Sequence, residues 1–376
     1  MGCGDCRIGE IMKIALLANG PGEVWGWCRP FIYEAVQRGW MVDVHLLPCP
    51  YASGREFSVL TGLPAHVVWY KNSLKALRSF RSSQKYDAVL QMGGDLLFGR
   101  ALARKQKIPL ACYSYGLKKG MEHCDVVMTS RLGLYKIDRL EIVGDLVLDS
   151  LDPGVPEKWS AVEGKRVAVF PGSRPQIRRK AFLFLQEIRR NLTLIAPDVE
   201  LRVLLSPFAE ENEIQTWRDE GFSVWTGTTP AGISGADLAL TQPGTNTLEL
   251  LYSRQPFAVT VPYSFLRQMP LSGLIGMVDK IPAIGAALRE RIIRSRMPHY
   301  IGKTAWPNRL AGKIIVPELI GEYNARQMAE SVFKILSDHE ALAAQRKQLD
   351  KLASVVLPGA PARICDIVER MTVHER

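Results

Sequence analysis

Residues 236–251 read Ala236-Asp-Leu-Ala-Leu-Thr-Gln-Pro-Gly-Thr-Asn-Thr-Leu-Glu-Leu-Leu251, and this stretch decides the fold. It predicts a short apolar strand, a Pro-Gly turn and a helix that begins at or just after Thr245. A helix that follows a strand presents unpaired backbone N–H groups, and a glycine lets a phosphate approach them. Gly244 and Thr245 are therefore a candidate anion-binding site. Glu249, about one helical turn further on, is placed to accept hydrogen bonds from both hydroxyls of a ribose. The alternative is a capping box with Asn246 as the cap and Glu249 as its reciprocal acceptor.

Apolar strands alternate with helical stretches along most of the chain, in two series. The first series runs from a strand at 12–18 to one at 140–143, and the second from 166–170 to 257–261. Between them, residues 152–164 contain two prolines and two glycines, which is typical of a linker. The alternation predicts an α/β protein with two parallel, Rossmann-like domains facing a central cleft.

The expected organisation has five parts. They are a disordered leader at 1–11, a first domain at 12–151, a linker at 152–164, a second domain at 165–340, and C-terminal helices at 341–376 that pack back on the first domain. Cys3 and Cys6 in the leader form a lone CxxC without a second pair, so a metal site is not expected there.

Composition narrows the class of protein. The chain has 376 residues, 47% of them hydrophobic and 23% charged, with a net charge of +10. It shows neither a membrane-spanning apolar run nor a signal peptide, which predicts a cytoplasmic protein, and its positive charge suggests an anionic partner. Nucleic acid is not the expected partner, because no nucleic-acid motif is present. The six histidines have no metal-ligand spacing, so neither a metal nor a cofactor is expected.

A second loop, Phe170-Pro-Gly-Ser-Arg174, also follows a strand. Gly172 allows close backbone approach, the Ser173 hydroxyl can bond an oxygen, and the Arg174 guanidinium can grip a phosphate. Together with Gln242–Thr245 it predicts a diphosphate site between the two loops, the alternative being a β-turn before a solvated helix. ATP hydrolysis and hydride transfer are disfavoured, because the chain lacks both GxxxxGK[ST] and GxGxxG at these loops.

Four motifs resemble, in their order, those of the lipid-A-disaccharide synthases, a family of inverting glycosyltransferases. The resemblance covers most of residues 12–375 and is strongest after 165. The motifs are Gly22-Glu-Val-Trp-Gly26, Phe170-Pro-Gly-Ser-Arg174, the block 236–251, and Pro307-Asn-Arg-Leu-Ala-Gly-Lys-Ile-Ile-Val-Pro-Glu-Leu319.

The resemblance implies a GT-B fold, a UDP-sugar donor on the second domain and a lipid-linked glucosamine acceptor on the first. It places Arg174 and the Gly244-Thr245 turn at the diphosphate, Glu249 at the ribose and Asn308 on the donor side. It also implies that catalysis needs no metal and that the enzyme acts at the inner face of the cytoplasmic membrane. A homodimer is compatible with the resemblance.

The first domain departs from the family pattern. Where the family has serine and aspartate after Gly-Glu, this chain has Trp25 and Trp27, and the histidine of a later Val-Gly-His-Pro stretch is Asp145. The family's Pro-Asp-Phe loop survives only as Gly94-Asp95-Leu96, and its Trp-Ala-Trp segment is absent around 114–120. The acceptor, and with it the reaction, is therefore expected to differ from lipid A assembly.

An inverting transfer needs a base for the acceptor hydroxyl, and the candidates are Asp95 and Glu23. Each follows a first-domain strand. The alternative for Asp95 is a helix N-cap, and the alternative for Glu23 is pairing with a helix start.

Residues 269–296 exceed what the family pattern needs. Their apolar start and arginine-rich end predict an interfacial membrane patch, the alternative being a helical hairpin packed on the domain. The patch residues are Leu274, Ile275, Arg289, Arg291, Arg294 and Arg296. The sequence thus favours a membrane-surface UDP-sugar glycosyltransferase. A UDP-sugar epimerase and an inactive UDP-sugar-binding protein are the alternatives.

Overall fold

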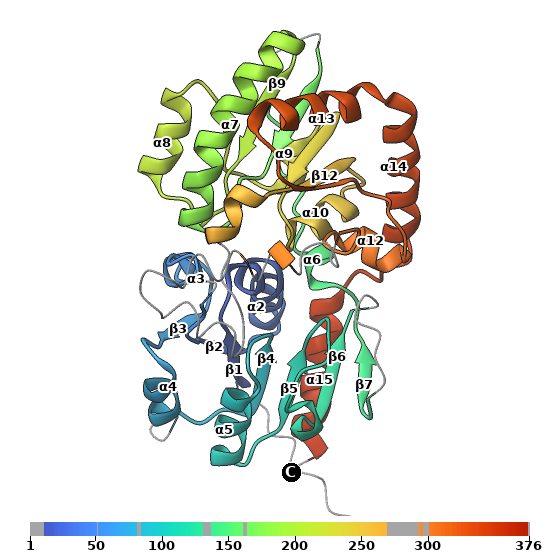
Figure 1. The fold of residues 1–376 in the computed structure, drawn as a ribbon. Helices are drawn as coiled ribbons and strands as arrows, with labels where there is room; N and C mark the ends of the chain where they lie inside the picture. The colour runs from blue at the N-terminus through green and yellow to red at the C-terminus, as the bar shows by residue number, and fades with distance from the viewer. Residues whose placement is uncertain are drawn as a thin grey trace, which may run out of the picture. The chain divides into compact units, whose positions relative to one another are not determined.

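The computed structural model describes residues 11–50, 52–80, 84–130, 137–160, 164–268, 291, 294–295 and 301–374. The chain divides into two compact units (Figure 1). Unit 1 comprises Met1–Cys49, Glu56–Ser150 and Leu357–Arg376, and unit 2 comprises Pro50–Arg55 and Leu151–Val356. The chain therefore leaves unit 1 beside the predicted linker, and it returns at Leu357 rather than at 341.

Unit 1 is built on a seven-stranded parallel sheet in the order β3-β2-β1-β4-β5-β6-β7. Its strands are near-continuous apolar runs because helices cover both faces. The order reverses between β1 and β4, and at such a switch point ligands bind beyond the carboxyl ends of the strands. The strands are β1 Lys13–Ala18, β2 Met41–Leu46, β3 His66–Trp69, β4 Ala88–Met92, β5 Leu110–Tyr113, β6 Val126–Thr129 and β7 Leu140–Ile142.

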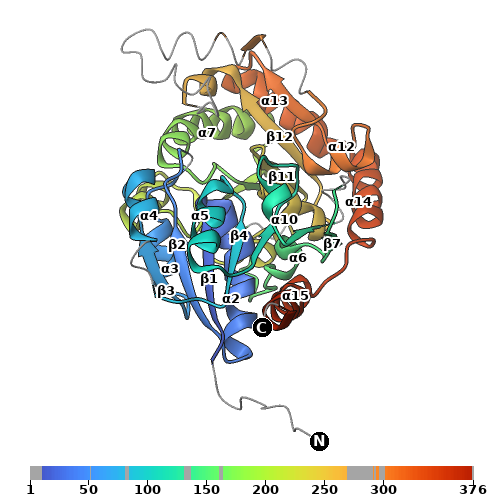
Figure 2. The same cartoon turned by 90° about the horizontal axis from the view of Figure 1, so that it is seen from below.

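Helices cover the unit 1 sheet, and one of them comes from the far end of the chain. On one face, α4 (Ser73–Ser79) and α5 (Leu97–Gln106) pack on a core that includes Leu17, Val89 and Leu102. Elsewhere in the unit, α15 (Ala360–His374) lies beside α2 (Arg29–Gln37), as Figure 2 shows. Shorter helices are α1 Pro21–Glu23, a π-helical turn at Val24–Cys28, α3 Glu56–Leu60, α6 Leu146–Asp149 and a 3₁₀ turn at Met121–His123.

Polar contacts hold α15 in place. Asp149, the last residue of α6, accepts hydrogen bonds from the backbone N–H groups of Gly359 and Ala360, both at 2.7 Å. Arg38, the residue after α2, pairs with Asp366 at 2.6 Å. The predicted return of the C-terminus to the first domain is therefore made by α15, whereas α14 (His339–Ala353) stays in unit 2.

Unit 2 contains a six-stranded parallel sheet in the order β10-β9-β8-β11-β12-β13. Its order reverses between β8 and β11. The predicted α/β fold with two Rossmann-like domains is confirmed, although β13 was not predicted. The strands are β8 Arg166–Val169, β9 Glu200–Leu204, β10 Ser223–Trp225, β11 Leu238–Thr241, β12 Phe257–Pro262 and β13 Glu318–Gly321.

The core of unit 2 lies between its sheet and two long helices, α7 (Pro175–Ile195) and α13 (Ala325–Ser337), which pack against each other (Figure 1). The buried residues of α7 fall on one face because they recur at helical spacing, at Ala181, Leu185, Ile188 and Leu192. The remaining helices in the described part of unit 2 are α8 Glu211–Asp219, α9 Thr229–Ile233, α10 Asn246–Tyr252, α12 Trp306–Ala311 and α14, with a 3₁₀ turn at Tyr263–Gln268. Asp338 separates α13 from α14, and its side chain caps α14.

The second half of the linker is fastened to unit 2. Arg202 of β9 is buried, and its guanidinium donates to the carbonyl oxygens of Glu157 and Lys158 at 3.1 and 2.8 Å. The same guanidinium lies over the Trp159 ring at 4.1 Å. The linker is therefore part of the unit 2 surface from Glu157 to Trp159.

Candidate functional site

Two predicted loops meet at the switch point of unit 2. One follows β8, the other follows β11, and Gln242 joins them because its Nε2 donates to the carbonyl oxygen of Pro171 at 3.2 Å. Gly172 has φ of 103°, and a Cβ there would lie 3.1 Å from Gln242 Oε1 and 3.0 Å from Ile177. Glycine is needed at 172 for both conformation and space. The structure thus brings the two loops together at the place where a parallel sheet binds ligands.

The buried side chain of Arg178 holds the first loop in place. Arg178 donates to the Ser173 carbonyl oxygen at 2.6 Å and makes a bidentate ion pair with Glu213 at 2.6 and 2.7 Å. Arg174 is the half-buried N-cap residue of α7, in extended conformation. Arg178 therefore belongs to the scaffold, while Arg174 lies at the positive end of a 21-residue helix.

The second loop has an open glycine. Gly244 has φ of 147°, and no atom lies within 4 Å of the position of an added Cβ. Thr245 is the N-cap residue of α10 and makes no side-chain cap hydrogen bond, so the cap is not Asn246 as the capping-box alternative required. Glu249 is 9% exposed, and its Oε2 accepts a 2.6 Å hydrogen bond from Thr229 Oγ1 of α9. The predicted helix start is confirmed.

Asn308 is a buried residue of α12 whose amide is fully engaged within unit 2. Its Nδ2 donates to Val316 O and Glu318 Oε1, both at 2.9 Å, and its Oδ1 accepts from the N–H groups of Ile315 and Val316. Two donors and two acceptor positions are thereby used. These bonds hold the segment before β13 in place, and the donor-side role that the family resemblance implies for Asn308 stays a prediction.

The switch point of unit 1 holds Glu23. Its Oε2 accepts a 2.7 Å hydrogen bond from the N–H of Gly20, and a side chain at Gly93, where φ is 75°, would overlap its Oε1. Burial raises the pKa of the Glu23 carboxyl, although the N–H groups of Gly20 and Gly94 and the ammonium of Lys118 act in the opposite direction. A carboxylate with a raised pKa between two glycine-rich strand ends has the character of a general base.

Asp95 lies after β4 at the same switch point, and its side chain is exposed. Its Oδ1 accepts a 3.0 Å hydrogen bond from the N–H of Leu97, the first residue of α5. Its side chain thus bonds the start of α5, although the N-cap position is Leu96 and not Asp95 as the N-cap alternative required. The catalytic roles of Asp95 and Glu23 both stay predictions, because Glu23 likewise bonds a helix start, at the N-cap residue Gly20 of α1.

Sequence reasoning missed Lys118 and Thr229. Lys118 lies in the loop after β5, and its Nζ donates to the carbonyl oxygen of Gly94 at 3.0 Å, which brings its charge near Glu23. Neither residue lies in a recognised motif. Only the position of each, just beyond a strand end, could have marked it.

Two of the departures from the family pattern in unit 1, Trp27 and Asp145, are joined by hydrogen bonds. Trp27 is buried, and its Nε1 donates to the hydroxyl of Tyr115 at 3.2 Å. The Tyr115 hydroxyl donates to Asp145 Oδ1 at 2.5 Å, and Asp145 also caps α6 through the N–H of Val147 at 2.9 Å. The rewritten positions 27 and 145 are therefore connected through Tyr115.

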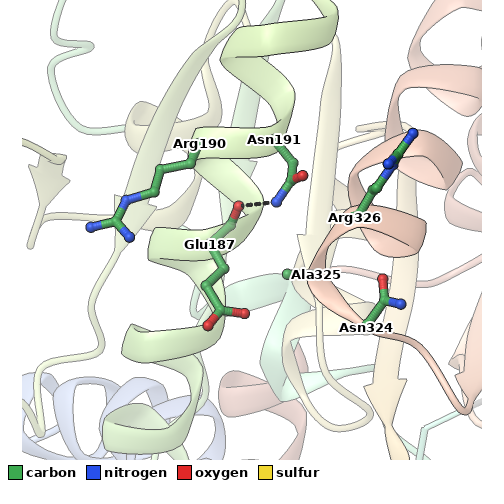
Figure 3. Close-up of a pocket in the computed structure, with 6 residues that line it drawn as sticks. All are labelled: Glu187, Arg190, Asn191, Asn324, Ala325 and Arg326. Atoms are coloured by element: carbon green, nitrogen blue, oxygen red, sulfur yellow. Dashed lines mark hydrogen bonds between the residues drawn. The ribbon is translucent and has the colours of Figure 1, made fainter.

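A shallow hollow of about 290 Å³ lies away from these loops, between α7 and α13 (Figure 3). Five of its six lining residues have polar side chains. Asn191 Nδ2 donates to the Glu187 carbonyl oxygen across one turn at 2.8 Å. It lies roughly 20 Å along α7 from Arg174, at a rise of about 1.5 Å per residue. The hollow is therefore separate from the switch point.

Of the predicted membrane patch, Arg291 and Arg294 fall within the described residues, and Leu274, Ile275, Arg289 and Arg296 lie outside them, as do Cys3 and Cys6. Arg294 pairs with Glu322, and its guanidinium lies 5.1 Å from the centroid of the Tyr263 ring. None of the helices in the described ranges is long and apolar enough to cross a membrane. The same ranges contain no group of three or more His, Cys, Asp or Glu side chains arranged to hold a metal.

Comparison with known proteins gives both sequence relatives and fold neighbours. No family model matches the chain. The chain is similar to the lipid-A-disaccharide synthase of Anaeromyxobacter dehalogenans (strain 2CP-C), with 27% identity over 237 residues, which are 60% of this chain and 56% of that protein. It is also similar to the lipid-A-disaccharide synthase of Gluconobacter oxydans (strain 621H), with 33% identity over 141 residues, 36% of this chain and 28% of that protein. The match thus spans little more than half the length of the first relative and little more than a quarter of the second.

Two solved structures share the fold. MurG of Acinetobacter baumannii has a TM-score of 0.55 at 14% identity, with 96% of this chain and 99% of that chain covered. The UDP-GlcNAc 2-epimerase of Neisseria meningitidis, bound to UDP-GlcNAc, has a TM-score of 0.55 at 14% identity, with 96% and 100% covered. The chain is a GT-B protein and a divergent relative of the lipid-A-disaccharide synthases.

Proposed function

We propose that the chain is a glycosyltransferase that moves a sugar from a UDP-sugar to a lipid-linked saccharide acceptor. Unit 2 binds the donor and unit 1 binds the acceptor. The donor sugar is of the N-acetylglucosamine type, the sugar carried by the nucleotide bound in one fold neighbour. The rewritten loops of unit 1 give the acceptor a different structure from that of the sequence relatives.

The observation that carries this proposal is the bridge between the two loops of unit 2. Gln242 and Pro171 fix them at the switch point, with Arg174 on one loop and the open Gly244 on the other. A guanidinium and backbone N–H groups are suited to the charge of a diphosphate without a metal. Gly172, Ser173 and Thr245 supply close backbone approach and hydroxyl contacts beside it.

The proposed reaction needs one base in unit 1. The oxygen of the acceptor hydroxyl attacks the anomeric carbon of the donor sugar, and the bond from that carbon to the β-phosphate oxygen breaks with inversion. The hydroxyl proton passes to the Glu23 carboxylate, and UDP leaves with its new charge facing Arg174. Asp95 is the second candidate for the base.

The lipid-linked acceptor requires the enzyme to work at the surface of the cytoplasmic membrane. Withdrawing lipid chains into water costs about 0.8 kcal/mol for each CH₂, so the protein must come to the bilayer. The net charge of +10 favours anionic headgroups. We expect the protein to sediment with anionic liposomes at low salt. Replacing Leu274 and Ile275 by Ser should weaken this binding. Wild-type binding by that variant would move the membrane contact elsewhere.

Product analysis tests the function. Radiolabelled UDP-N-acetylglucosamine is incubated with the protein and a bacterial lipid extract, and the products are separated and weighed by mass spectrometry. A labelled lipid supports transfer. An isomerised nucleotide sugar would instead support an epimerase, the activity named for one of the fold neighbours. Unchanged donor that nonetheless binds would indicate a binding protein without catalysis.

A further inference from the structure

We propose that Thr229 is a positioning residue for nucleotide recognition, because it sets the orientation of the Glu249 carboxylate toward the ribose. The inference rests on the proposed donor site of unit 2. It adds a residue that no sequence motif marks, and it explains how a carboxylate inside the protein is held ready for a sugar with two neighbouring hydroxyls.

The contact is short and charge-assisted. Thr229 Oγ1 donates to Glu249 Oε2 at 2.6 Å, and the two residues are 20 positions apart in the chain. Glu249 is 9% exposed, on a helix whose residues from Thr247 to Tyr252 are all buried. The helix backbone is therefore fixed by packing, and the remaining freedom of Glu249 is side-chain rotation, which the Thr229 hydroxyl restricts.

The position of Thr229 is fixed in turn by Trp225. The indole N–H of Trp225 donates to the carbonyl oxygen of Thr228 at 2.8 Å. Its ring fills the space beside Gly227 and Gly232, where any side chain would overlap it. The segment from β10 to α9 is thereby held against the sheet, and Thr229 presents its hydroxyl from a rigid support.

The chemistry of the pair fits a ribose. A carboxylate offers about four acceptor positions, which is enough for the Thr229 hydroxyl and two vicinal ribose hydroxyls together. Fixing the carboxylate plane before the ligand arrives removes an entropic cost from binding. Thr229 should therefore affect affinity only for nucleotides that carry those hydroxyls.

Calorimetry with UDP and 2′,3′-dideoxy-UDP tests this separation. For the wild type we expect UDP to bind roughly tenfold or more tightly than the dideoxy analogue, since hydrogen bonds to charged groups are the strong ones. Thr229→Val should weaken UDP binding by about three- to tenfold, leave dideoxy-UDP binding within about twofold, and so reduce the ratio of the two affinities. Thr229→Ser should restore the ratio.

Thr228→Val is the matched control. The Thr228 hydroxyl is buried one residue away and has no hydrogen-bond partner among the described residues, so its loss should leave the ratio unchanged. Thr229→Ala repeats the test if the valine variant does not fold. A wild-type ratio in folded Thr229→Val or Thr229→Ala would overturn the role of Thr229 while leaving the donor site intact. Failure of the wild type to bind UDP would overturn the donor site and the inference with it.

Discussion

Replacing Glu23 by glutamine tests the centre of the proposed reaction. An amide keeps the size of the side chain, so the close approach to Gly93 is not made worse, and its oxygen can still accept the N–H of Gly20. What the variant loses is the ability to take a proton. The acceptor hydroxyl would then have to lose its proton to water.

The expected loss follows from the environment of Glu23. A positioned general base contributes about 10²–10⁴-fold in rate, and one whose pKa is raised toward neutral pH is the more effective. The turnover number of Glu23→Gln should fall by that factor, which raises the barrier by about 3–5 kcal/mol. UDP affinity should stay within about twofold, because all proposed donor contacts belong to unit 2.

The assay measures initial rates of labelled-lipid formation at saturating donor, together with calorimetric UDP affinity and thermal melting as a check on folding. Asp95→Asn is the matched comparison, and its rate should change by only a few-fold because its carboxylate is exposed and bonds the N–H of Leu97 at the start of α5. If folded Glu23→Gln keeps more than about a tenth of wild-type turnover while Asp95→Asn loses it, the assignment is refuted and Asp95 is the base.

Three further variants probe the remaining chemistry. Lys118→Met removes a cation that lowers the pKa of Glu23. Because the proposed base works as a carboxylate, the acidic limb of the pH–rate profile should move to higher pH. If the limb does not move, Lys118 does not influence the ionisation of the base. Arg174→Ala should weaken UDP binding by about 1–3 kcal/mol, whereas the exposed Arg179→Ala should not, as calorimetry would show. Burial lowers the pKa of His45 to about 4, against about 6.5 in the unfolded chain. Below pH 6.5 the unfolded chain therefore binds one proton more than the native protein, and stability falls as the pH drops toward 4. In urea unfolding, the stability difference between wild type and His45→Asn should narrow by about 2 kcal/mol from pH 7 to pH 5; a constant difference would refute the buried neutral histidine.

Most of the fold could be predicted because parallel strands covered on both faces are continuous apolar runs. The strand β13 escaped prediction because it is short, lies at the edge of the sheet and begins with Glu318. The carboxylate of Glu318 binds the N–H groups of Gly302, Thr304 and Ala305, a role that no local pattern displays.

The π-helical turn at Val24–Cys28 also escaped prediction. Pro30 has no N–H to donate to Gly26, which interrupts the usual helical ladder, and Arg29 donates to Val24 five residues back. The sequence shows that a proline follows this turn, but it does not show how the backbone hydrogen bonds rearrange before the proline.

The site was predictable where residues follow strand ends, and not where partners are distant in sequence. The strand–loop–helix patterns at Gly172 and Gly244 are local, and both loops lie at the switch point. The partner of Glu249 is Thr229, and the partner of Gly94 is Lys118, and tertiary packing alone creates these pairs. Asn308 lies in a family motif, but the motif did not reveal that the hydrogen bonds of its side-chain amide are made within unit 2.

The position of α15 has a consequence for how the protein is made. Gly359 and Ala360 bind Asp149, and Arg363 donates to the carbonyl oxygen of Val143 at 2.7 Å, so unit 1 is completed by residues synthesised after unit 2. During translation the surface of α2 and α6 that α15 covers stays exposed until α15 has left the ribosome. Unit 2 is contiguous apart from Pro50–Arg55 and can assemble first. A nascent chain stalled before residue 357 should therefore display a folded unit 2 and a unit 1 that depends on chaperones.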